Sequence, residues 1–559
     1  MKRKLILTFL PVMLTVFFIN IFYSAAIFAE TNDVIAEKAM VATAHPIASA
    51  VGIEILKEGG NAVDAAMAVA FALSIAEPNA SGIGGGGFIV IKMANKKEAV
   101  MIDYRERAPE RAVAEYYYDS ESGFKSLTTV GPSAIGVPGL VAGAEISLKK
   151  YGTMTLAQIL QPAIELCKNG IVVSEKLNEM ILNNIEKISN YPATAEVYLK
   201  DMFPLEEGDT LRNLDLASSL VKLSGQGGDI FYKGELAKLM ANEIQQLGGV
   251  LSYSDLKTYE AKVRKPVRGK YRGYDIITSA PPSWGGTHLI ELLNIMEGYN
   301  VKKMEHNSAK YIHVFTEAMK MIYADKAINA ADPDFYKVPV KTFLKKRYAK
   351  KLRKRIEPNK ARFDYKSKKR SSRESTSTSH LSIVDEHGNI VALTQSINHW
   401  FGSGVVVPGT GILLNDHMND FNDKPGTPNS IEPFKRPASN TAPTIILKNG
   451  KPFMTLGTPG GSRIISALAQ VIMNVIDFEM SMDDAIEAPR VHCINKVLHV
   501  EGRINEKVID VLREMGHEVK VRSDFDNYFG GAQGILFNHQ TNKLHGGADS
   551  RRDGKAIGY

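Results

Sequence analysis

The sequence predicts an α+β protein, and three parts of the chain carry that prediction. Two helices are expected near the start, over Pro46–Lys57 and Ala62–Ala76, followed by a glycine-rich loop and a strand at residues 88–92. Residues 155–348 alternate helical stretches with polar turns, show no internal repeat and are expected to be mainly helical. A β-hairpin is then predicted, with strands at Ser379–Val384 and at residues 390–394.

Local signals support the two early helices and the loop after them. The first helix is expected to end at Gly59-Gly60, because a left-handed cap favours glycine, and Asn61 can cap the second helix. The second helix is apolar almost all round, which is typical of a buried helix. The glycine-rich loop from Ser81 to Gly87 follows a helix and precedes a strand, the reverse of the order in a phosphate-binding loop. We therefore interpret it as backbone that passes close to another part of the molecule.

The predicted hairpin begins where the chain changes character. Residues 371–380 form the lowest-complexity stretch, with the composition of a disordered linker. At Thr378 that composition stops, and alternating strand residues follow, with turn residues at 385–389 that include Gly388. This junction is the most informative place in the sequence.

Composition excludes several classes of protein. The chain has 559 residues, of which 44% are hydrophobic and 23% charged, values typical of soluble globular proteins and not of disordered or fibrous ones. Cys167 and Cys493 can form at most one bridge, and two free buried thiols are an equal alternative. The usual zinc-binding spacings are absent, so we expect no metal and no cofactor.

The positive charge of the chain is concentrated in one segment. Residues 341–373 contain 16 Lys and Arg against two acids, which leaves 52 basic and 59 acidic groups elsewhere. A nucleic-acid interaction would use this segment, but no ladder of aromatic residues accompanies it. We favour a solvated basic stretch and expect no nucleic-acid partner.

The amino terminus has the layout of an export signal. Lys2, Arg3 and Lys4 precede an apolar run at residues 5–23, and small residues follow, so cleavage is expected after Ala26 or Ala29. We assign residues 1–29 to a signal peptide, with an uncleaved anchor as the alternative. The mature protein would be secreted, extracellular or periplasmic, with no stable membrane span.

The hairpin that starts at Thr378 resembles the start of the small subunit of the gamma-glutamyltransferases, also called gamma-glutamyl transpeptidases or glutathione hydrolases. Six further motifs, in the expected order along the mature chain, are similar to that family: residues 59–66, 81–88, 103–106, 136–139, 411–421 and 459–463. The resemblance implies an amino-terminal nucleophile hydrolase with a four-layer αββα sandwich. It also implies a precursor that cuts itself between Ser377 and Thr378 into a large chain, residues 30–377, and a small chain, residues 378–559, which stay together as a heterodimer.

The chemistry of such a cut explains why a threonine stands at the junction. A hydroxyl is a poor nucleophile without a base, and a new amino-terminal threonine carries one in its own α-amine, whose pKa is about 7.7–8.0. We therefore predict Thr378 as the nucleophile; Thr376 is the local alternative, and the spacing to His380 favours Thr378. By resemblance, Gly460 and Gly461 supply the backbone N–H groups of an oxyanion hole, and the hydroxyl of Ser396 bonds to the nucleophile.

The resemblance also implies a site for the α-amino acid end of a γ-glutamyl substrate. Arg105 matches the arginine that binds the α-carboxylate, since a guanidinium can grip a carboxylate through two parallel bonds. Asp420 matches the group that holds the α-ammonium. The remaining polar contacts are expected from Asn398, His417, Ser439 and Asn440.

Three departures from the family pattern bear on the substrate. His417 replaces a glutamine or glutamate, Asn440 replaces a second serine, and the stretch between Phe421 and Lys435 is too short for a lid. An open cleft would admit γ-linked polymers as well as glutathione, and a basic motif at Arg551-Arg552 would suit a polyanion. The leading prediction is a γ-glutamyltransferase acting on glutathione. The alternatives are a poly-γ-glutamate depolymerase or transpeptidase, a glutaryl (cephalosporin) acylase, and an inactive uncleaved relative.

Overall fold

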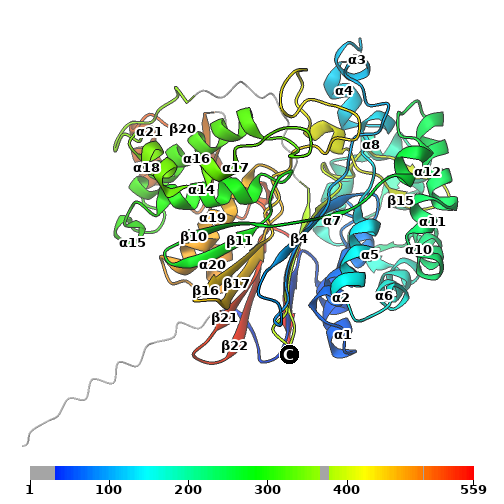
Figure 1. Cartoon of the computed structure of the whole chain (residues 1–559), viewed down its shortest axis with the longest axis horizontal. Helices are drawn as coiled ribbons and strands as arrows, with labels where there is room; N and C mark the ends of the chain where they lie inside the picture. The colour runs from blue at the N-terminus through cyan, green and yellow to red at the C-terminus, as the bar shows by residue number, and fades with distance from the viewer. Residues whose placement is uncertain (1–31, 122, 366–376, 495) are drawn as a thin grey trace, which may run out of the picture. The chain divides into compact units, whose positions relative to one another are not determined.

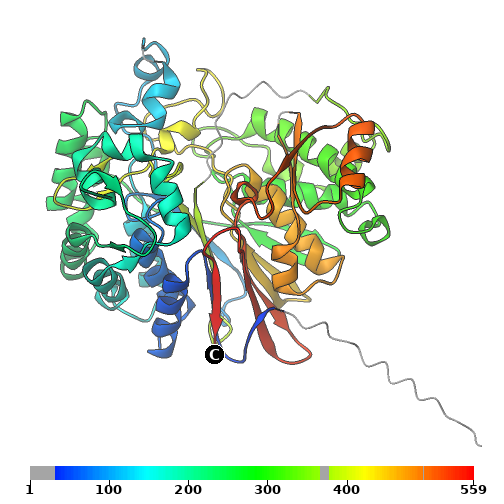
Figure 2. The same ribbon diagram turned by 180° about the vertical axis from the view of Figure 1, so that it is seen from behind.

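The computed structural model describes residues 32–121, 123–365, 377–494 and 496–559, and the described residues belong to one compact unit. Two seven-stranded sheets pack face to face in this unit, and helices cover the outer face of each sheet (Figure 1). The view from behind shows the same order of layers (Figure 2). The predicted four-layer αββα sandwich of the α+β class is confirmed. The predicted signal peptide, residues 1–29, and Thr376 lie outside the described residues.

The two large sheets are mostly antiparallel ladders of strands from distant parts of the chain. In spatial order, the first sheet consists of β1 (Val34–Ala36), β22 (Lys543–Ala548), β21 (Gln533–Asn538), β17 (Lys451–Gly457), β16 (Thr444–Lys448), β11 (Tyr274–Thr278) and β10 (Val267–Tyr271). The second sheet consists of β23 (Lys555–Gly558), β2 (Met40–Thr43), β12 (Ser379–Val384), β13 (Ile390–Ser396), β3 (Gly86–Lys92), β4 (Val100–Tyr104) and β9 (Lys262–Arg264).

Smaller two- and three-stranded sheets lie outside the sandwich. They contain β5 (Ile171–Val172) with β8 (Thr210–Leu211), β6 (Leu199–Lys200) with β7 (Phe203–Pro204), β14 (Val406–Val407) with β15 (Ile412–Leu413), and β18 (Val491–Ile494) with β19 (Val497–Glu501) and β20 (Glu518–Arg522).

The helices fall into two groups, one on each side of the sandwich (Figure 1). The group beside the second sheet includes α1 (Pro46–Lys57), α2 (Ala62–Ala76), α5 (Leu140–Tyr151), α6 (Leu156–Asn169), α10 (Leu214–Gln226), α11 (Asp229–Tyr232) and α12 (Glu235–Gln246). The group beside the first sheet includes α14 (Gly285–Met296), α16 (Ala309–Asn329), α18 (Lys346–Arg353), α19 (Arg463–Ile476), α20 (Met482–Glu487) and α21 (Glu506–Glu514).

The sequence signals at α1 and α2 are confirmed. Gly59 has a φ of 93°, as the left-handed end of a helix requires, and Asn61 caps α2 in a capping box with Asp64. All residues of α2 are buried, because the helix lies against β12 and β13 on one side and against α1 and α6 on the other. The hairpin β12–β13 also forms where it was predicted.

The middle of the chain is mainly helical, as predicted, but it also contains the two-residue strands β5 to β8 and a longer β segment at residues 262–278. That segment forms β9, β10 and β11, and it adds strands to both large sheets. Its pairing partners are β4 and β16, which lie far away in the sequence, so local periodicity could not reveal it.

Two other expectations concern surface charge and cysteine. The basic segment contains α18, where Ala349 and Leu352 are buried while most of its lysines face solvent, as a solvated basic helix requires. Cys167 and Cys493 are free and buried, so of the two alternatives the structure has two thiols and no bridge. Among the described helices, none combines the length and the apolar character needed to cross a membrane.

The two sheets pack closely where β17 meets β12, and a substitution there tests the packing. A Cβ added at Gly457 would come within 3.0 Å of three ring atoms of His380, which is fully buried and bonded to Thr394 and Ser382. We expect Gly457→Ala to lower the free energy of unfolding by about 1–3 kcal/mol through overpacking. Thermal unfolding checks this against Gly225→Ala in α10, where an added Cβ has open space and should not destabilise. Equal melting temperatures for both variants would contradict the close sheet contact.

Candidate active site

The candidate site lies along one end of the second sheet, where four neighbouring strands begin or end. Thr378 directly precedes β12, and Ser396 is the last residue of β13. Ser396 pairs with Gly86 at the start of β3, and Gly87 pairs with Tyr104 at the end of β4. Arg105 follows Tyr104, so strand register brings the predicted nucleophile and the predicted carboxylate-binding arginine to the same sheet end, about 14 Å apart at the usual strand spacing.

Thr378 is buried and has an unusual backbone conformation. Its φ is 123°, a region that a β-branched residue rarely adopts. Its hydroxyl lies 3.0 Å from the hydroxyl of Ser396, as the resemblance implies. Ser377, the residue before it, donates its hydroxyl hydrogen to the carbonyl of Asn398. The Ser377–Thr378 peptide is thus held on both sides by contacts to the end of β13.

A second set of contacts fixes the other side of Thr378. The guanidinium of Arg552 donates to the Thr378 carbonyl at 2.9 Å and pairs with Glu77 at 3.1 Å. Glu77 also accepts a hydrogen bond from Ser379. Burial raises the pKa of Glu77, and Arg552 and Ser379 partly offset that rise. A single carboxylate therefore holds both the first residue of β12 and the arginine that binds the Thr378 carbonyl.

The glycine-rich loop acts as predicted, as backbone in close contact with other segments. A Cβ at Gly84, Gly85 or Gly86 would overlap the carbonyl oxygens of Leu413, Ser396 and Tyr104 respectively. Side chains at these positions would push the loop away from β15, β13 and β4. The loop therefore brings these site strands together.

Arg105 and Asp420 form a direct ion pair. The side chain of Arg105 is only 2% exposed and that of Asp420 is 25% exposed, and the guanidinium also lies 3.4 Å from Glu106. Asp420 ends a short 3-10 helix, His417–Asp420. The two groups expected to bind opposite charges of one substrate thus neutralise each other in this structure.

His417 and Glu106 form an uncharged contact beside this pair. Their nearest atoms, His417 Nδ1 and Glu106 Oε1, are 2.9 Å apart, although not in hydrogen-bonding geometry. Burial, reinforced by Arg105, lowers the pKa of His417 well below its usual value, and burial raises the pKa of Glu106 to about 8. At neutral pH the imidazole and the carboxyl group are both neutral, so Arg105 and Asp420 keep the charged roles.

The remaining predicted residues lie on loops that border this group. Arg105 donates through Nε to the carbonyl of Pro437 at 3.3 Å, which places the segment of Ser439 and Asn440 next to it. The Ser439 hydroxyl is 3.2 Å from that of Thr441, and the side-chain oxygen of Asn440 is buried without a hydrogen-bond partner in the described part of the chain. The short segment after Phe421 is bonded to Tyr118, and Asn429 binds the Asp420 carbonyl at 2.8 Å.

Gly460 and Gly461 follow β17, the strand that packs on β12 through Gly457 and His380. Both have positive φ values, 124° and 57°. Their N–H groups donate no hydrogen bond within the residues that the structure describes, and none joins them to Thr378. Two adjacent backbone N–H groups of this kind are the donors that an oxyanion hole requires.

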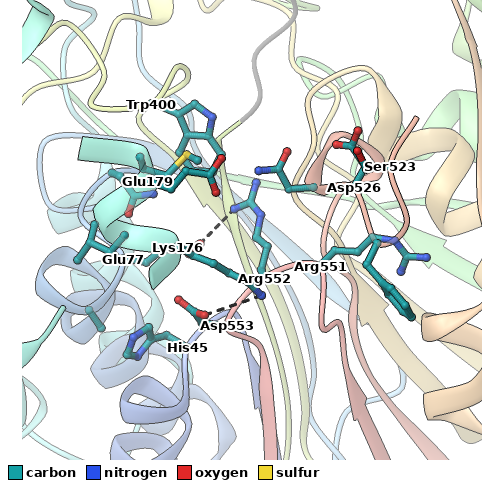
Figure 3. A pocket seen from close by; sticks show the side chains of 16 residues that line it. His45, Glu77, Lys176, Glu179, Trp400, Ser523, Asp526, Arg551, Arg552 and Asp553 are labelled. Atoms are coloured by element: carbon teal, nitrogen blue, oxygen red, sulfur yellow. Dashed lines mark hydrogen bonds and ion pairs between the residues drawn. The ribbon is translucent and has the colours of Figure 1, made fainter. Parts of the chain in front are cut away.

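A cavity of about 310 Å³ lies beside Arg552 (Figure 3). Glu77, Trp400 and Lys176 line it, and the Arg552 guanidinium lies 4.7 Å from the centre of the Trp400 ring system. Arg551 is instead held by Glu501 and Asp549, and its side chain points away from that of Arg552 (Figure 3). The expectation of an extra arginine facing the cleft is therefore wrong for Arg551, whose charge is used inside the protein.

One cluster has the residue types of a metal site. His313, Glu317 and His517 are buried and place ligand atoms within 4.8 Å of one another. However, the two imidazoles are hydrogen-bonded at 2.8 Å, and Glu317 binds Lys320 and Tyr365 at 2.8 Å each. His517 Nδ1 has no partner among the described residues, but the two imidazoles bond to each other and a lysine ammonium occupies the carboxylate, so the cluster fits a structural network better than a cation site.

Sequence reasoning missed Glu77, Glu106, His399 and Asp416. Glu106 lies inside a recognised motif, but its neutral state results from tertiary burial. Asp416 also lies inside a recognised motif, residues 411–421, but nothing in that motif indicates its pairing with His399. Glu77 and His399 lie outside the recognised motifs, and Glu77 meets its partner Arg552 only in the folded chain.

Comparisons with known proteins agree with this architecture, which is that of the amino-terminal nucleophile hydrolases. The sequence profile of the gamma-glutamyltranspeptidase family matches residues 48–559, and the chain belongs to that family. It is 39% identical to the glutathione hydrolase proenzyme of Escherichia coli (strain K12), over 94% of this chain and 93% of that protein. It is 40% identical to the acylase ACY 1 proenzyme of Pseudomonas sp. (strain SE83), over 93% of each.

The structural comparison includes an acylase as well. The cephalosporin acylase from Bacillus halodurans has a TM-score of 0.87 and 30% identity, with 95% of this chain and 97% of that chain covered. The chain is therefore an enzyme of the hydrolase and transferase type. Glutathione hydrolase and acylase relatives are equally similar to it, so similarity alone does not distinguish the substrate.

The raised pKa of Glu106 predicts how stability changes with pH. The folded state keeps the proton up to about pH 8, whereas the unfolded chain loses it near 4.5, so stability should fall as the pH rises between these values. Glu106→Gln removes this titration, and we expect its melting temperature to fall less than that of the wild type from pH 5 to 8. Thermal unfolding across this range checks the prediction; parallel curves for the two proteins would show that Glu106 ionises normally.

Proposed function

We propose that the chain is a self-processing γ-glutamyl hydrolase and transferase. In this proposal residues 1–29 are a signal peptide, and cleavage between Ser377 and Thr378 gives chains 30–377 and 378–559, which remain together. The mature enzyme would be extracellular or periplasmic. It would cleave γ-glutamyl amides such as glutathione and pass the glutamyl group to water or to an amine.

The conformation of Thr378 supports self-cleavage. A threonine at a φ of 123° stores about 1–3 kcal/mol of backbone strain, and its neighbours hold that conformation. In the first step the Thr378 hydroxyl oxygen attacks the Ser377 carbonyl carbon, the peptide C–N bond breaks, and an ester replaces the amide. The hydroxyl proton passes to the leaving nitrogen, so this step frees the Thr378 α-amine. Water then hydrolyses the ester, which releases the Ser377 carboxylate and restores the Thr378 hydroxyl. The strain is lost with the peptide bond, which favours the products.

The same threonine can then act on substrate. The new α-amine takes the hydroxyl proton while the oxygen attacks the γ-carbonyl carbon, and the N–H groups of Gly460 and Gly461 stabilise the negative charge on the carbonyl oxygen. The leaving amine accepts the proton, and a glutamyl ester remains on Thr378. Water or an amine acceptor releases the glutamyl group and restores the hydroxyl.

The Arg105–Asp420 pair is the observation that carries the choice of substrate. An α-amino acid end presents one carboxylate and one ammonium, so it can replace this internal pair with two charge-matched contacts. A glutaryl group has no ammonium, so it would compete for Arg105 without offering Asp420 a charge-matched contact in return.

Two alternatives keep specific support. The similarity to acylase ACY 1 and to a cephalosporin acylase favours glutaryl amides as a second donor class. The short segment between Phe421 and Lys435, which folds back onto Tyr118, favours access for longer γ-linked chains. Direct comparison of the three donors ranks these substrates.

Substitution of Thr378 tests the central step. We expect the wild-type protein to separate into two chains, one of which begins at Thr378, and Thr378→Ala to stay as one chain without activity, because no hydroxyl is present to attack Ser377. Intact mass and amino-terminal sequencing check this. Thr376→Ala is the matched control and should be cut like the wild type. One uncut chain from both the wild-type and Thr378→Ala proteins would refute the self-processing mechanism.

Substitution of Asp420 tests the substrate class. We expect Asp420→Asn to lower kcat/KM for glutathione by about 10- to 100-fold, since a charge-assisted contact to the ammonium is lost. Turnover of a glutaryl amide should stay constant or rise. Arg105→Gln serves as the control and should impair both donors, because both carry the carboxylate. Equal losses for the two donors in Asp420→Asn would mean that Asp420 does not bind the ammonium.

A further inference from the structure

An ion pair between His399 and Asp416 lies next to the candidate site, and no role has been assigned to it. Asp416 is fully buried, and its Oδ2 lies 2.5 Å from His399 Nδ1. Burial alone would lower the pKa of His399 and raise that of Asp416. The interaction between the two groups is stronger than this effect, so the pKa of His399 is raised and that of Asp416 is lowered. Each group therefore favours the charged form of the other, and the two side chains are paired.

All polar contacts of the His399 ring run through one nitrogen. Nδ1 faces Asp416 and, at 3.4 Å, the side-chain amide of Asn398. Nε2 is buried and has no hydrogen-bond partner among the described residues. The position and orientation of the ring therefore depend on Asp416.

Asp416 also forms three hydrogen bonds to residues 397–399 besides its contact with the His399 ring. Its Oδ1 accepts the His399 N–H at 3.0 Å, and its carbonyl accepts the Asn398 side-chain amide at 3.0 Å. Its own N–H donates to the carbonyl of Ile397 at 3.1 Å. Residues 397–399 are thus clamped to the segment that leads into His417 and Asp420.

The contacts of Asp416 surround Asn398, which has a strained backbone conformation. Asn398 has a φ of 84°, which L residues adopt at a cost unless their surroundings hold them there. On the carboxyl side of His399, Lys187 binds the carbonyls of Trp400 and Gly402 at 2.9 and 3.0 Å. Contacts to the segments before and after His399 therefore hold Asn398 in its conformation. Asp416 contacts residues 397–399 themselves, whereas Lys187 contacts residues 400 and 402.

The conformation of Asn398 determines where the nucleophile lies. The Asn398 N–H donates to the Ser396 hydroxyl oxygen at 2.8 Å, and that oxygen is 3.0 Å from the Thr378 hydroxyl. The Asn398 carbonyl accepts the hydroxyl hydrogen of Ser377. A change in Asn398 would therefore move the partners of both residues that flank the proposed cleavage bond.

We propose that His399 and Asp416 are positioning residues for Thr378, acting through Asn398 and Ser396. They touch neither the substrate nor the reacting atoms. They hold Asn398 so that the Ser396 hydroxyl meets the nucleophile in one orientation, first for self-cleavage and then for attack on substrate. This inference rests on the proposed role of Thr378.

The test compares single variants of the full-length protein after processing. We expect His399→Ala and Asp416→Ala to lower kcat for glutathione by about 10- to 100-fold, the range for a misplaced reacting group, while KM stays within about threefold of the wild type. Both should also slow the appearance of the small chain after synthesis. His399→Asn should keep most of the wild-type kcat and most of the wild-type processing rate, because the asparagine amide can donate a hydrogen bond to Asp416 in place of Nδ1.

A double-mutant cycle separates positioning from loss of stability. In a Ser396→Ala background, where the intermediate hydroxyl is absent, His399→Ala should have a much smaller effect on kcat than in the wild type. In an Arg105→Lys background its effect should be undiminished. His545→Ala is the matched control: it breaks another His–Asp pair, with Asp33 at 3.0 Å, on the first sheet, and should leave kcat unchanged.

The outcomes are distinct. A fall in melting temperature with unchanged kcat, or equal effects of His399→Ala with and without the Ser396 hydroxyl, would overturn the positioning role. A raised KM with normal kcat would also overturn it and would indicate substrate binding instead. If the wild-type protein itself neither cuts at Thr378 nor turns over γ-glutamyl donors, the proposed function fails, whatever these variants do.

Discussion

The antiparallel pairing of β12 with β13 is the constraint on which the site depends. β12 lies between β2 and β13 in one sheet and faces β17 and β21 of the other, so its position is fixed by neighbours in two layers. The pairing places Thr378 at the start of one strand beside Ser396 at the end of the other. Because both strands are buried on both faces, a one-residue shift in register would move each side chain to the opposite packed layer, and it would also misplace the nucleophile.

The charges around this sheet end are arranged so that almost every buried one is compensated. Arg552 pairs with Glu77, Arg105 with Asp420, and His399 with Asp416. Glu106 and His417 avoid the cost by staying neutral. Buried ion pairs contribute little net stability, and their geometry is the more useful property here, because they hold side chains in single orientations around Thr378.

Much of the fold and part of the site were predictable from local patterns. The caps of α1 and α2, the buried character of α2, the close approach of the glycine loop and the hairpin at Thr378 depend on residues near one another in the sequence. Strands β9 to β11 were missed, because their pairing partners are remote. The adjacent residues Arg551 and Arg552 look alike in sequence, yet only Arg552 bonds to Thr378, while Arg551 is surrounded by Glu501 and Asp549.

By itself the sequence determined the motifs, their order and the junction at which a threonine begins a strand, because these features are written in residue types and short spacings. Tertiary structure decided which charges meet and which groups lose theirs. Asp416 reaches His399 and Glu77 reaches Arg552 only after distant segments pack, and burial, which no single residue encodes, sets the protonation of Glu106 and His417.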